Sequence, residues 1–525
     1  MLQIPIGIRL FLKDQYRSLV VYRFLVLILT YLAYASYHLS RRSFSIVKNV
    51  LSPHCSNATD KSNVTSFTDL DCNGWSPFNR GDSETLFSFL DSVFLFAYAF
   101  GMFFSGFIAE RCNLRYFLAM GMLLSGVLNY CLGLAFYYNI HSLWFFVIFQ
   151  LLSGLMQTTG WPAVVCCIGN WVPKSSRGVL FGFWNSHTNV GNILGAIIAG
   201  AFVDYNWGLS FIVPGIIIAI VGFLLFLFLV PCPEDVGISS SDIHSEIRPA
   251  IETSPSSASY SSVFQSSQDS GVYPNESSNK NEKHRRKNLN QGEESSEVNE
   301  EDSPLLRSND YSINFNNTER HAISFYHALW IPGVLEFSFC LFFAKLVSYT
   351  FLFWLPFYIK YSVHISSSDS AYLSASFDLG GIIGAIMAGY IVDRYGYSAL
   401  TCVGMLTMAI PSLLCYYNFG ATSNLLNILL QVISGAFVNG PYSLITTTVS
   451  TELGTKVKSS QALATVTAII DGTGSFGAAI GPLLSGPLAV YGWKYVFLMV
   501  ILSDAVAMLS LIRIAKQEFQ RYRRA

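Results

Sequence analysis

Long apolar runs constrain this sequence more than any other feature. Twelve stretches are each long enough to cross a hydrocarbon layer about 30 Å thick as an α-helix. Only 12% of the 525 residues are charged, about half the share that is usual in a soluble domain. The sequence therefore predicts an all-α membrane protein with helices at 24–48, 86–109, 116–137, 143–168, 179–203, 209–230, 329–359, 371–392, 399–418, 425–450, 460–485 and 493–514.

The twelve runs fall into two sets of six, separated by a polar stretch. We expect an N-terminal six-helix half at 1–231, which includes a luminal loop at 49–85, and a C-terminal six-helix half at 328–525. The intervening stretch at 232–327 is rich in Ser, Asn and Glu and lacks apolar periodicity. It is therefore predicted to be a disordered cytosolic loop.

The polar stretch carries one candidate binding motif. The segment Glu301-Asp-Ser-Pro-Leu305-Leu306 resembles an acidic di-leucine signal, which would bind a sorting adaptor. The alternative is a chance match, because short motifs of this kind arise often in disordered segments.

The basic residues of the short loops lie on one side of the predicted membrane. They follow the second, fourth, eighth and tenth runs and flank both ends of the chain. Because basic loops remain cytosolic, both termini are expected in the cytosol and the loop at 49–85 on the opposite side. In that loop we predict glycosylation at Asn57 and Asn63 and, in an oxidising compartment, a disulfide between Cys55 and Cys72.

Two adjacent arginines, Arg41 and Arg42, lie deep in the first run. A helix that begins at residue 24 places them well into or across the hydrocarbon layer. The alternative is that they snorkel at the far end, but uncancelled positive charge is disfavoured on the non-cytosolic side. Ionisable residues inside a membrane usually face a cavity on a substrate path. Since guanidinium groups match the geometry of phosphate, we interpret the pair as an anion-binding site.

Lys345 is a third cation inside an apolar run. Its burial carries the same energetic cost as that of Arg41, so we predict that it faces the same cavity. The alternative is an ion pair with a membrane acid such as Glu336 or Asp378.

The fifth run contains an unusually polar segment, from Asn185 to Asn192. Small and polar residues often join helices to one another, and for most of them that is the simpler interpretation. This segment is denser in polar groups than packing requires. It either lines the cavity, with His187 or Thr188 as the substrate contact, or packs between helices.

The two halves repeat a short motif after their second helix. Gly106-Phe-Ile-Ala-Glu110-Arg111 matches Gly389-Tyr-Ile-Val-Asp393-Arg394. A duplicated six-helix unit with an acid–arginine turn in each half resembles the major facilitator superfamily. In this interpretation Glu110, Arg111, Asp393 and Arg394 latch helix ends in one conformation.

Longer stretches make the resemblance more specific. Nearly the whole chain outside 232–327 resembles the sugar-phosphate exchangers of solute carrier family 37. The resemblance rests on Tyr34-Ala-Ser-Tyr37-His38-Leu-Ser-Arg41-Arg42, Gln157-Thr-Thr-Gly-Trp161-Pro162, Gly169-Asn170-Trp171, the stretch from Trp184 to Gly195, the stretch from Trp207 to Gly215, and Ala344-Lys345-Leu-Val-Ser-Tyr349.

The resemblance implies exchange of a sugar phosphate, such as glucose 6-phosphate, for inorganic phosphate across the endoplasmic reticulum membrane. It also implies that Arg41 is the first-helix phosphate-binding arginine and Arg42 the basic residue that follows it. The expected substrate-binding residues are Tyr34, Tyr37, His38, Arg41, Arg42, Trp161, His187, Thr188, Asn189, Lys345, Ser348 and Tyr349.

The sequence departs from the related bacterial glycerol-phosphate antiporters at two positions. Their seventh-helix arginine is replaced here by Ser348, and Lys345, three residues earlier on roughly the same face, could supply the charge. Their fifth-helix histidine is replaced by Thr188. The neighbouring His187 is turned by about 100° around the helix.

These residues predict an antiporter rather than an enzyme. A cavity with unpaired charge on Arg41, Arg42 and Lys345 would reorient only after an anion had neutralised it, which predicts obligatory exchange by alternating access. No cofactor or metal is expected, and a net charge of −1 gives no indication of a nucleic-acid partner, so the expected partners are the two substrates and membrane lipid.

Two other functions and one other location remain open from the sequence. A proton-coupled transporter of organic anions could use His38 or His187 as its titrating group. A transporter-like subunit that acts mainly by binding a partner would fit the long polar stretch and the serine at position 348. The endolysosomal membrane is the alternative location.

Overall fold

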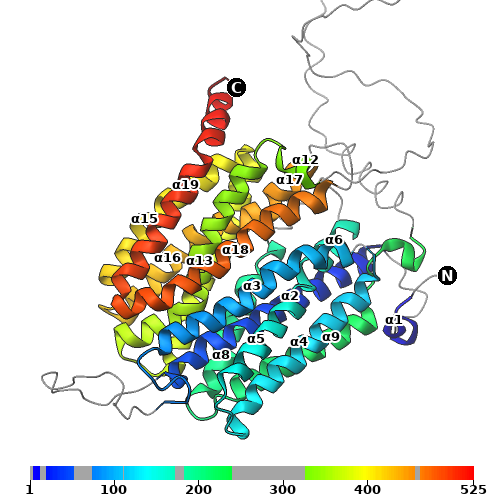
Figure 1. Cartoon of the computed structure of the whole chain (residues 1–525). Coiled ribbons are helices and arrows are strands. Elements are labelled where there is room, and N and C mark those ends of the chain that lie inside the picture. Colours follow the sequence, from blue (N-terminus) through cyan, green and yellow to red (C-terminus); the bar gives the residue numbers. More distant parts are fainter. Residues whose placement is uncertain are drawn as a thin grey trace, which may run out of the picture. The chain divides into compact units, whose positions relative to one another are not determined.

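The computed structural model describes residues 4–11, 19–52, 74–109, 111–171, 183–238, 325–455 and 462–524. Within these ranges the regular structure is helical and contains no strand (Figure 1). The predicted disulfide, both glycosylation sites, the di-leucine motif and Glu110 lie outside the described residues.

The N-terminal half contains six membrane-spanning segments, drawn from blue to green in Figure 1. One of them consists of two consecutive helices, α5 and α6. The helices are α2 (Leu19–Leu51), α3 (Ser83–Ala109), α4 (Leu114–Tyr137), α5 (Leu143–Gln157), α6 (Gly160–Trp171), α8 (His187–Val203) and α9 (Leu209–Phe228).

The C-terminal half contains the other six segments, drawn from light green to red. In one of them α16 is continued by the π-helical turn η4 and by α17. The helices are α13 (Val334–Val363), α14 (Ser367–Tyr395), α15 (Ser398–Phe419), α16 (Asn424–Leu444), η4 (Ile445–Val449), α17 (Ser450–Thr455), α18 (Ala462–Tyr491) and α19 (Trp493–Arg524).

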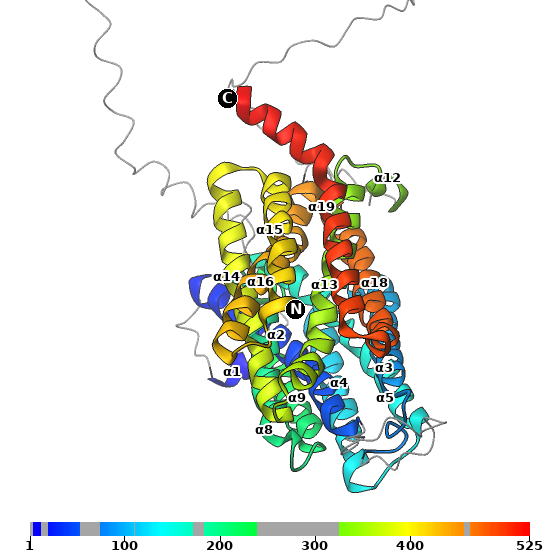
Figure 2. The same ribbon diagram turned by 90° about the vertical axis from the view of Figure 1, so that its left-hand side faces the viewer.

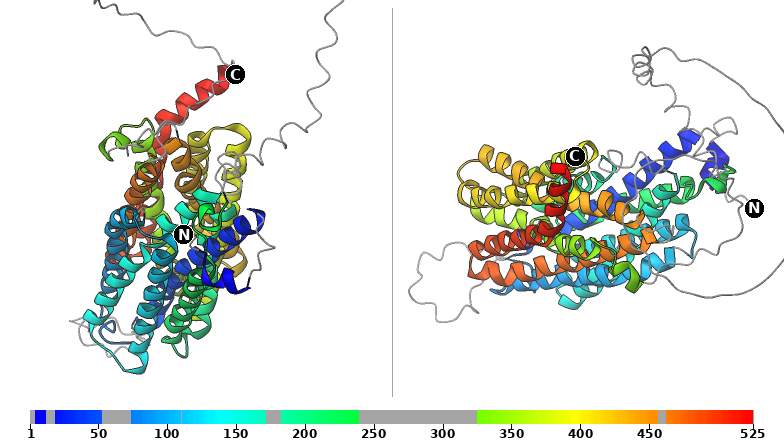
Figure 3. Two further views of the ribbon diagram at one scale, coloured as in Figure 1. Left: turned by 90° about the vertical axis from the view of Figure 1, so that its right-hand side faces the viewer. Right: turned by 90° about the horizontal axis from the view of Figure 1, so that it is seen from above.

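Length and composition confirm the predicted fold class. In the described part of the chain, ten segments are long and apolar enough to cross a membrane. The shorter apolar α8 and the 30-residue α18 bring the number to twelve, six in each half. The last helix is longer than predicted, because α19 continues to Arg524 and extends past its neighbours (Figures 2 and 3).

Three short helices lie outside the membrane-spanning segments. They are α1 (Ile6–Phe11), η3 (Pro233–Val236) and α12 (Phe325–Leu329). Val236, inside the predicted polar loop, and Ala328, directly after it, are both buried. The structure thus places helical residues inside both ends of the range 232–327.

The fourth predicted helix is interrupted where the sequence contains proline. Pro162 has no N–H to donate to the carbonyl four residues earlier, that of Thr158, and its ring would clash with that carbonyl in a continuous helix. The chain turns at this point, and the hydroxyls of Thr158 and Thr159 donate to Leu155 O (2.6 Å) and Met156 O (2.9 Å). The interruption places Gln157 at the end of α5, beside Arg41 of α2.

The tenth predicted helix is also irregular. Pro441 lies near the end of α16, and the backbone widens into the π-helical turn η4 four residues later. Such turns often occur at functional sites. The segment remains one membrane-spanning unit, because Asn424–Gly454 is apolar throughout a membrane-crossing length.

Close approach of α8 to α2 depends on two glycines. A Cβ atom on Gly191 would lie 2.3 Å from Ala35 O, and one on Gly195 would lie 2.6 Å from Leu39 O. Glycines four residues apart allow two helix backbones to approach closely. This packing brings the polar face of α8 next to His38.

Between described residues, most hydrogen bonds that join the two halves lie toward the end of α2 that carries Lys48 and Asn49, called here the Asn49 end. Ser45 Oγ donates to Leu352 O (2.9 Å), Asn49 Nδ2 to Ser370 Oγ (3.0 Å), and Lys360 Nζ to Asn49 O (2.6 Å). Pro356 explains the first contact, because it leaves the carbonyl of Leu352 without its helical N–H donor.

Candidate functional site

A small cavity lies between the two halves, about midway along the helices. It has about 10 Å³ of free volume, close to the minimum that holds one water molecule. A ligand of several heavy atoms would therefore require the halves to move apart. The lining residues are His38 of α2, Thr188, Asn189 and Asn192 of α8, Ser348, Tyr349 and Leu352 of α13, Phe377 and Asp378 of α14, and Asn439 and Tyr442 of α16.

Arg41 is not one of the lining residues; it follows the lining residue His38 by about one turn of α2 and is 4% exposed. Its Nε donates to Gln157 Oε1 (2.6 Å), and its guanidinium carbon lies 4.5 Å from the centre of the Tyr98 ring. Both terminal nitrogens are buried and have no hydrogen-bond partner among the described residues. Because buried donors are normally satisfied, two free donors on one guanidinium indicate a place for an acceptor such as an anion.

Arg42 has a different role in the geometry. One terminal nitrogen of Arg42 donates to Leu352 O. The other terminal nitrogen donates to Ser374 Oγ (2.8 Å) and also lies 3.9 Å from Asp378 Oδ2. All three partners belong to the C-terminal half. Arg42 therefore connects the halves and has its charge opposed by Asp378.

Lys345 forms an ion pair within the C-terminal half. Its Nζ lies 2.8 Å from Asp471 Oδ1 of α18, and both side chains are buried. Lys345 does not line the cavity, and the alternative prediction, an ion pair with a membrane acid, describes its position. The acid is neither Glu336, which pairs with Arg513, nor Asp378, which lies beside Arg42. Asp471, the acid that Lys345 contacts, was not predicted as its partner from the sequence.

These pairs correct the predicted electrostatics of the site. The sequence predicted three unpaired cations, whereas Arg42 and Lys345 each lie near a carboxylate. Among the described cationic residues of the site, Arg41 has no carboxylate within ion-pair distance. The empty site thus carries about one uncompensated positive charge.

The fifth-helix residues separate into two environments. Thr188 and Asn189 line the cavity, and their neighbour His187 does not. His187 is fully buried against aromatic rings, with the centre of Trp184 4.3 Å away and that of Tyr34 4.7 Å away. Its Nδ1 is 3.2 Å from Thr188 Oγ1.

The aromatic candidates pack against one another behind the cavity-lining residues of α2 and α8. Tyr34 packs on Trp161 with ring centres 5.1 Å apart, and its hydroxyl lies 3.4 Å from that of Tyr98. The hydroxyl of Tyr37 lies 3.0 Å from Thr159 Oγ1. Neither Tyr34, Tyr37 nor Trp161 lines the cavity in this conformation, so they support the residues that do.

Two candidates on α13 lie at the cavity itself. Ser348 Oγ donates to Asn439 Oδ1 (2.6 Å), which occupies its hydroxyl proton. Tyr349 lines the cavity and stacks on Phe353, with ring centres 6.3 Å apart.

The proposed latch residues lie away from the cavity. Asp393 and Arg394 end α14 and are exposed, and Arg111 is exposed in the turn before α4.

A further buried ion pair was not predicted from the sequence. Lys48 of α2 pairs with Asp91 of α3, and both side chains are fully buried. The Lys48 ammonium also lies 4.6 Å from the centre of the Trp354 ring and 3.4 Å from Phe353 O, both in the other half. A lysine and an aspartate inside separate apolar runs are the signal that could have revealed this pair.

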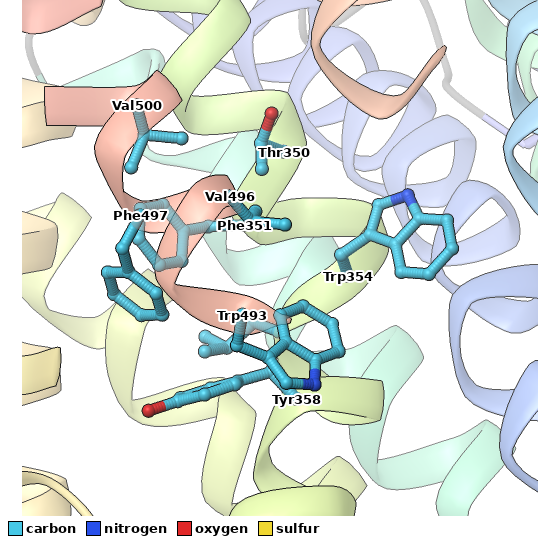
Figure 4. A pocket seen from close by; sticks show the side chains of 9 residues that line it. Thr350, Phe351, Trp354, Tyr358, Trp493, Val496, Phe497 and Val500 are labelled. Carbon is cyan, nitrogen blue, oxygen red and sulfur yellow. The ribbon is translucent and has the colours of Figure 1, made fainter. Parts of the chain in front are cut away.

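A second pocket lies between α13 and α19, within the C-terminal half (Figure 4). Aromatic and aliphatic side chains such as Phe351, Trp493 and Phe497 surround it, and the surface that faces the pocket is apolar. None of the described lining residues is charged. This pocket therefore lacks the groups that would bind an anion.

Comparison with known proteins identifies the class. The Major Facilitator Superfamily model matches residues 24–267 and 337–521, which is most of the chain. A bacterial homolog of the human lysosomal transporter Spinster, in an inward-facing and unoccupied conformation, superposes with a TM-score of 0.59. That structure is 14% identical and covers 95% of this chain and 98% of its own, so it shows the fold alone.

Curated relatives are much more similar in sequence. The glucose-6-phosphate exchanger SLC37A2 of Danio rerio is 47% identical over 507 residues, covering 95% of this chain and 93% of that protein. The corresponding SLC37A2 of Homo sapiens is 45% identical, with 95% and 93% covered, and human SLC37A1 is 44% identical, with 99% and 97% covered. The chain belongs to the major facilitator superfamily and, within it, to the family of SLC37A1 and SLC37A2, which confirms the predicted resemblance.

Proposed function

We propose that this protein exchanges a sugar phosphate, such as glucose 6-phosphate, for inorganic phosphate by alternating access. The observation that supports it most is Arg41, a buried arginine with two free donors, about one turn of α2 from His38, which lines the cavity at the interface of the two halves. Phosphate is an acceptor of suitable geometry and charge for such a fork. The relatives named above are glucose-6-phosphate exchangers, which supports the same substrate class.

The charge of the site gives a physical reason for obligatory exchange. Arg42 and Lys345 lie near carboxylates, so Arg41 alone presents uncompensated charge when the site is empty. Moving this charge through a closed, dry intermediate is costly, and a bound phosphate group removes the cost. Only the loaded carrier then reorients readily, and two ligands that share a phosphate group exchange for one another.

The bonds between the halves indicate which side opens first. Among the described residues they are concentrated at the Asn49 end, whereas on the other side of the cavity Asn185 Nδ2 donates to Ser443 Oγ (2.6 Å). By the basic-loop argument the Asn49 end is luminal. We therefore propose that this conformation opens to the cytosol more easily than to the lumen of the endoplasmic reticulum.

The first test is counterflow with purified protein in liposomes. Labelled phosphate is supplied outside vesicles that contain phosphate, glucose 6-phosphate or neither. Uptake is expected to be more than about tenfold faster into vesicles that contain either phosphate compound, because an empty carrier cannot return. Uptake into empty vesicles that follows an imposed pH gradient would instead establish the proton-coupled alternative, and no uptake in any vesicle would support the partner-binding one.

Substitution of Asp471 by asparagine is expected to tighten apparent phosphate affinity and slow turnover. The change removes the carboxylate from Lys345, whose ammonium lies 5.6 Å from the centre of the Tyr442 ring at the cavity wall. An additional uncompensated cation attracts phosphate, but it also raises the charge that must cross after release. The measurement is the KM and maximal rate of exchange. A higher KM with an unchanged maximal rate would contradict the expectation.

A further inference from the structure

His38 lies on α2, one turn before Arg41, and it lines the cavity. Residues three apart on a helix share a face, so the His38 ring and the Arg41 guanidinium approach the site from the same side. The ring is buried, and its Nε2 has no hydrogen-bond partner among the described residues. Nε2 is thus a buried polar atom without a partner on a residue that lines the cavity.

A hydrogen-bonded chain determines the state of this ring. Asp378 Oδ1 lies 2.8 Å from Asn192 Nδ2, and an ionised carboxylate can only accept, so the amide nitrogen of Asn192 must face Asp378. The amide oxygen then faces His38 Nδ1, at 3.1 Å. Because that oxygen can only accept, His38 Nδ1 must donate.

The proton on Nδ1 determines the state of Nε2, on the opposite edge of the neutral ring. With its proton on Nδ1, a neutral imidazole carries a bare lone pair on Nε2. The site therefore combines the donors of Arg41 with one acceptor on His38. The positive charge of Arg42 favours the ionised form of Asp378, because one terminal nitrogen lies 3.9 Å from Asp378 Oδ2. The same nitrogen donates to Ser374 Oγ, which holds the guanidinium in place.

We propose that His38 Nε2 is a specificity-determining acceptor that selects anions carrying a hydroxyl group, with Asn192 and Asp378 as its positioning residues. This inference rests on the proposed function and adds a rule for which anions the site accepts. Inorganic phosphate retains a P–OH group at neutral pH, and a sugar phosphate offers hydroxyls on its carbon chain. Sulfate is a fully ionised tetrahedral anion of similar size, and it has no proton to donate.

The selection has a simple physical basis. A hydroxyl-bearing ligand satisfies both Arg41 and the His38 lone pair, whereas sulfate places an oxygen lone pair against a nitrogen lone pair. A site that is built to hydrogen-bond a hydroxyl discriminates strongly against an analogue that lacks it. Arsenate is the matched probe, because it has the shape of phosphate and retains a hydroxyl group.

The test is competition against labelled phosphate exchange, with the full-length protein in phosphate-loaded liposomes. For the wild type, arsenate is expected to inhibit at a concentration at least about tenfold lower than sulfate. His38→Leu removes the acceptor and should reduce this difference to less than about threefold. His38→Gln can present its amide oxygen to the cavity and should retain more of the difference, while Asn192→Leu, which frees the ring to rotate, should give an intermediate value.

The ratio of two inhibition constants does not depend on how much protein folds, so a loss of stability alone cannot imitate the effect. His141→Ala is the control, because His141 lies in a loop and contacts Ser76 O rather than the site. Equal inhibition by sulfate and arsenate in the wild type, or an unchanged ratio in His38→Leu, would overturn the inference. If His38→Leu transports nothing, the wild-type ratio and His38→Gln decide the question. Absence of wild-type phosphate exchange would instead reject the proposed function itself.

Discussion

Replacement of Arg41 by alanine is expected to lower phosphate exchange at least about a hundredfold. The two free guanidinium nitrogens are donors to the phosphate group in the proposed site. A hydrogen bond to a charged group contributes about 1.5–3 kcal/mol, and loss of two therefore weakens binding by a factor of about a hundred or more. The measurement is counterflow of labelled phosphate, normalised to the amount of folded protein in the vesicles.

Two further substitutions make this result specific. Arg41→Lys retains the charge but not the planar fork, so it should transport better than the alanine variant and less well than the wild type. Arg513→Gln changes an arginine whose side chain is 71% exposed, and it should exchange at the wild-type rate. Undiminished exchange in Arg41→Ala would remove Arg41 from the site.

The twelve segments and their grouping could be predicted because a membrane imposes one requirement on every segment. Each must be apolar over a fixed length, and this requirement leaves a local signal in the sequence. The interruptions at Pro162 and Pro441 had local signals too. A proline inside an apolar run frees a carbonyl and disturbs the helix, and each of these two lies beside the site.

The ion pairs could not be predicted in the same way. Lys345 had several possible acids in the second half, and the one it contacts, Asp471, is 126 residues away. Which acid approaches depends on how α13 packs on α18, and no local pattern encodes that. The pairing matters for function, because it changes the empty site from three uncompensated charges to about one.

The different environments of Arg41 and Arg42 could not be predicted either, because they too depend on helix packing. Adjacent residues on a helix point about 100° apart, so two neighbouring arginines cannot both face one small cavity. The sequence gives no phase for the helix, and only the packing of α2 against α8 and α13 decides which arginine faces the site. Arg41 retains two free donors, whereas Arg42 contacts Leu352 and Ser374 of the other half.

Removal of Asp91 is expected to destabilise the protein strongly. Asp91 and Lys48 are both fully buried, and Lys48 also contacts the Trp354 ring and the carbonyl of Phe353 across the interface. An Asp91→Leu variant leaves the ammonium buried without its counter-ion, which typically costs about 3–5 kcal/mol. Thermal unfolding in detergent, followed by the fraction of monodisperse protein after heating, measures the loss.

The double variant Lys48→Met/Asp91→Leu separates the cost of an unpaired charge from the value of the pair. A buried ion pair gains little over apolar side chains of similar volume, because desolvation offsets most of the Coulomb attraction. The double variant should therefore recover most of the stability that Asp91→Leu loses. Arg513→Met, which breaks the exposed pair with Glu336, is the matched control and should cost less than about 1 kcal/mol.

If Asp91→Leu is as stable as the control, the two side chains are not the buried pair described here. Recovery in the double variant would instead mean that this end of the interface is held by shape and apolar contact, and that the bonds of Ser45, Asn49 and Lys360 determine how readily it opens.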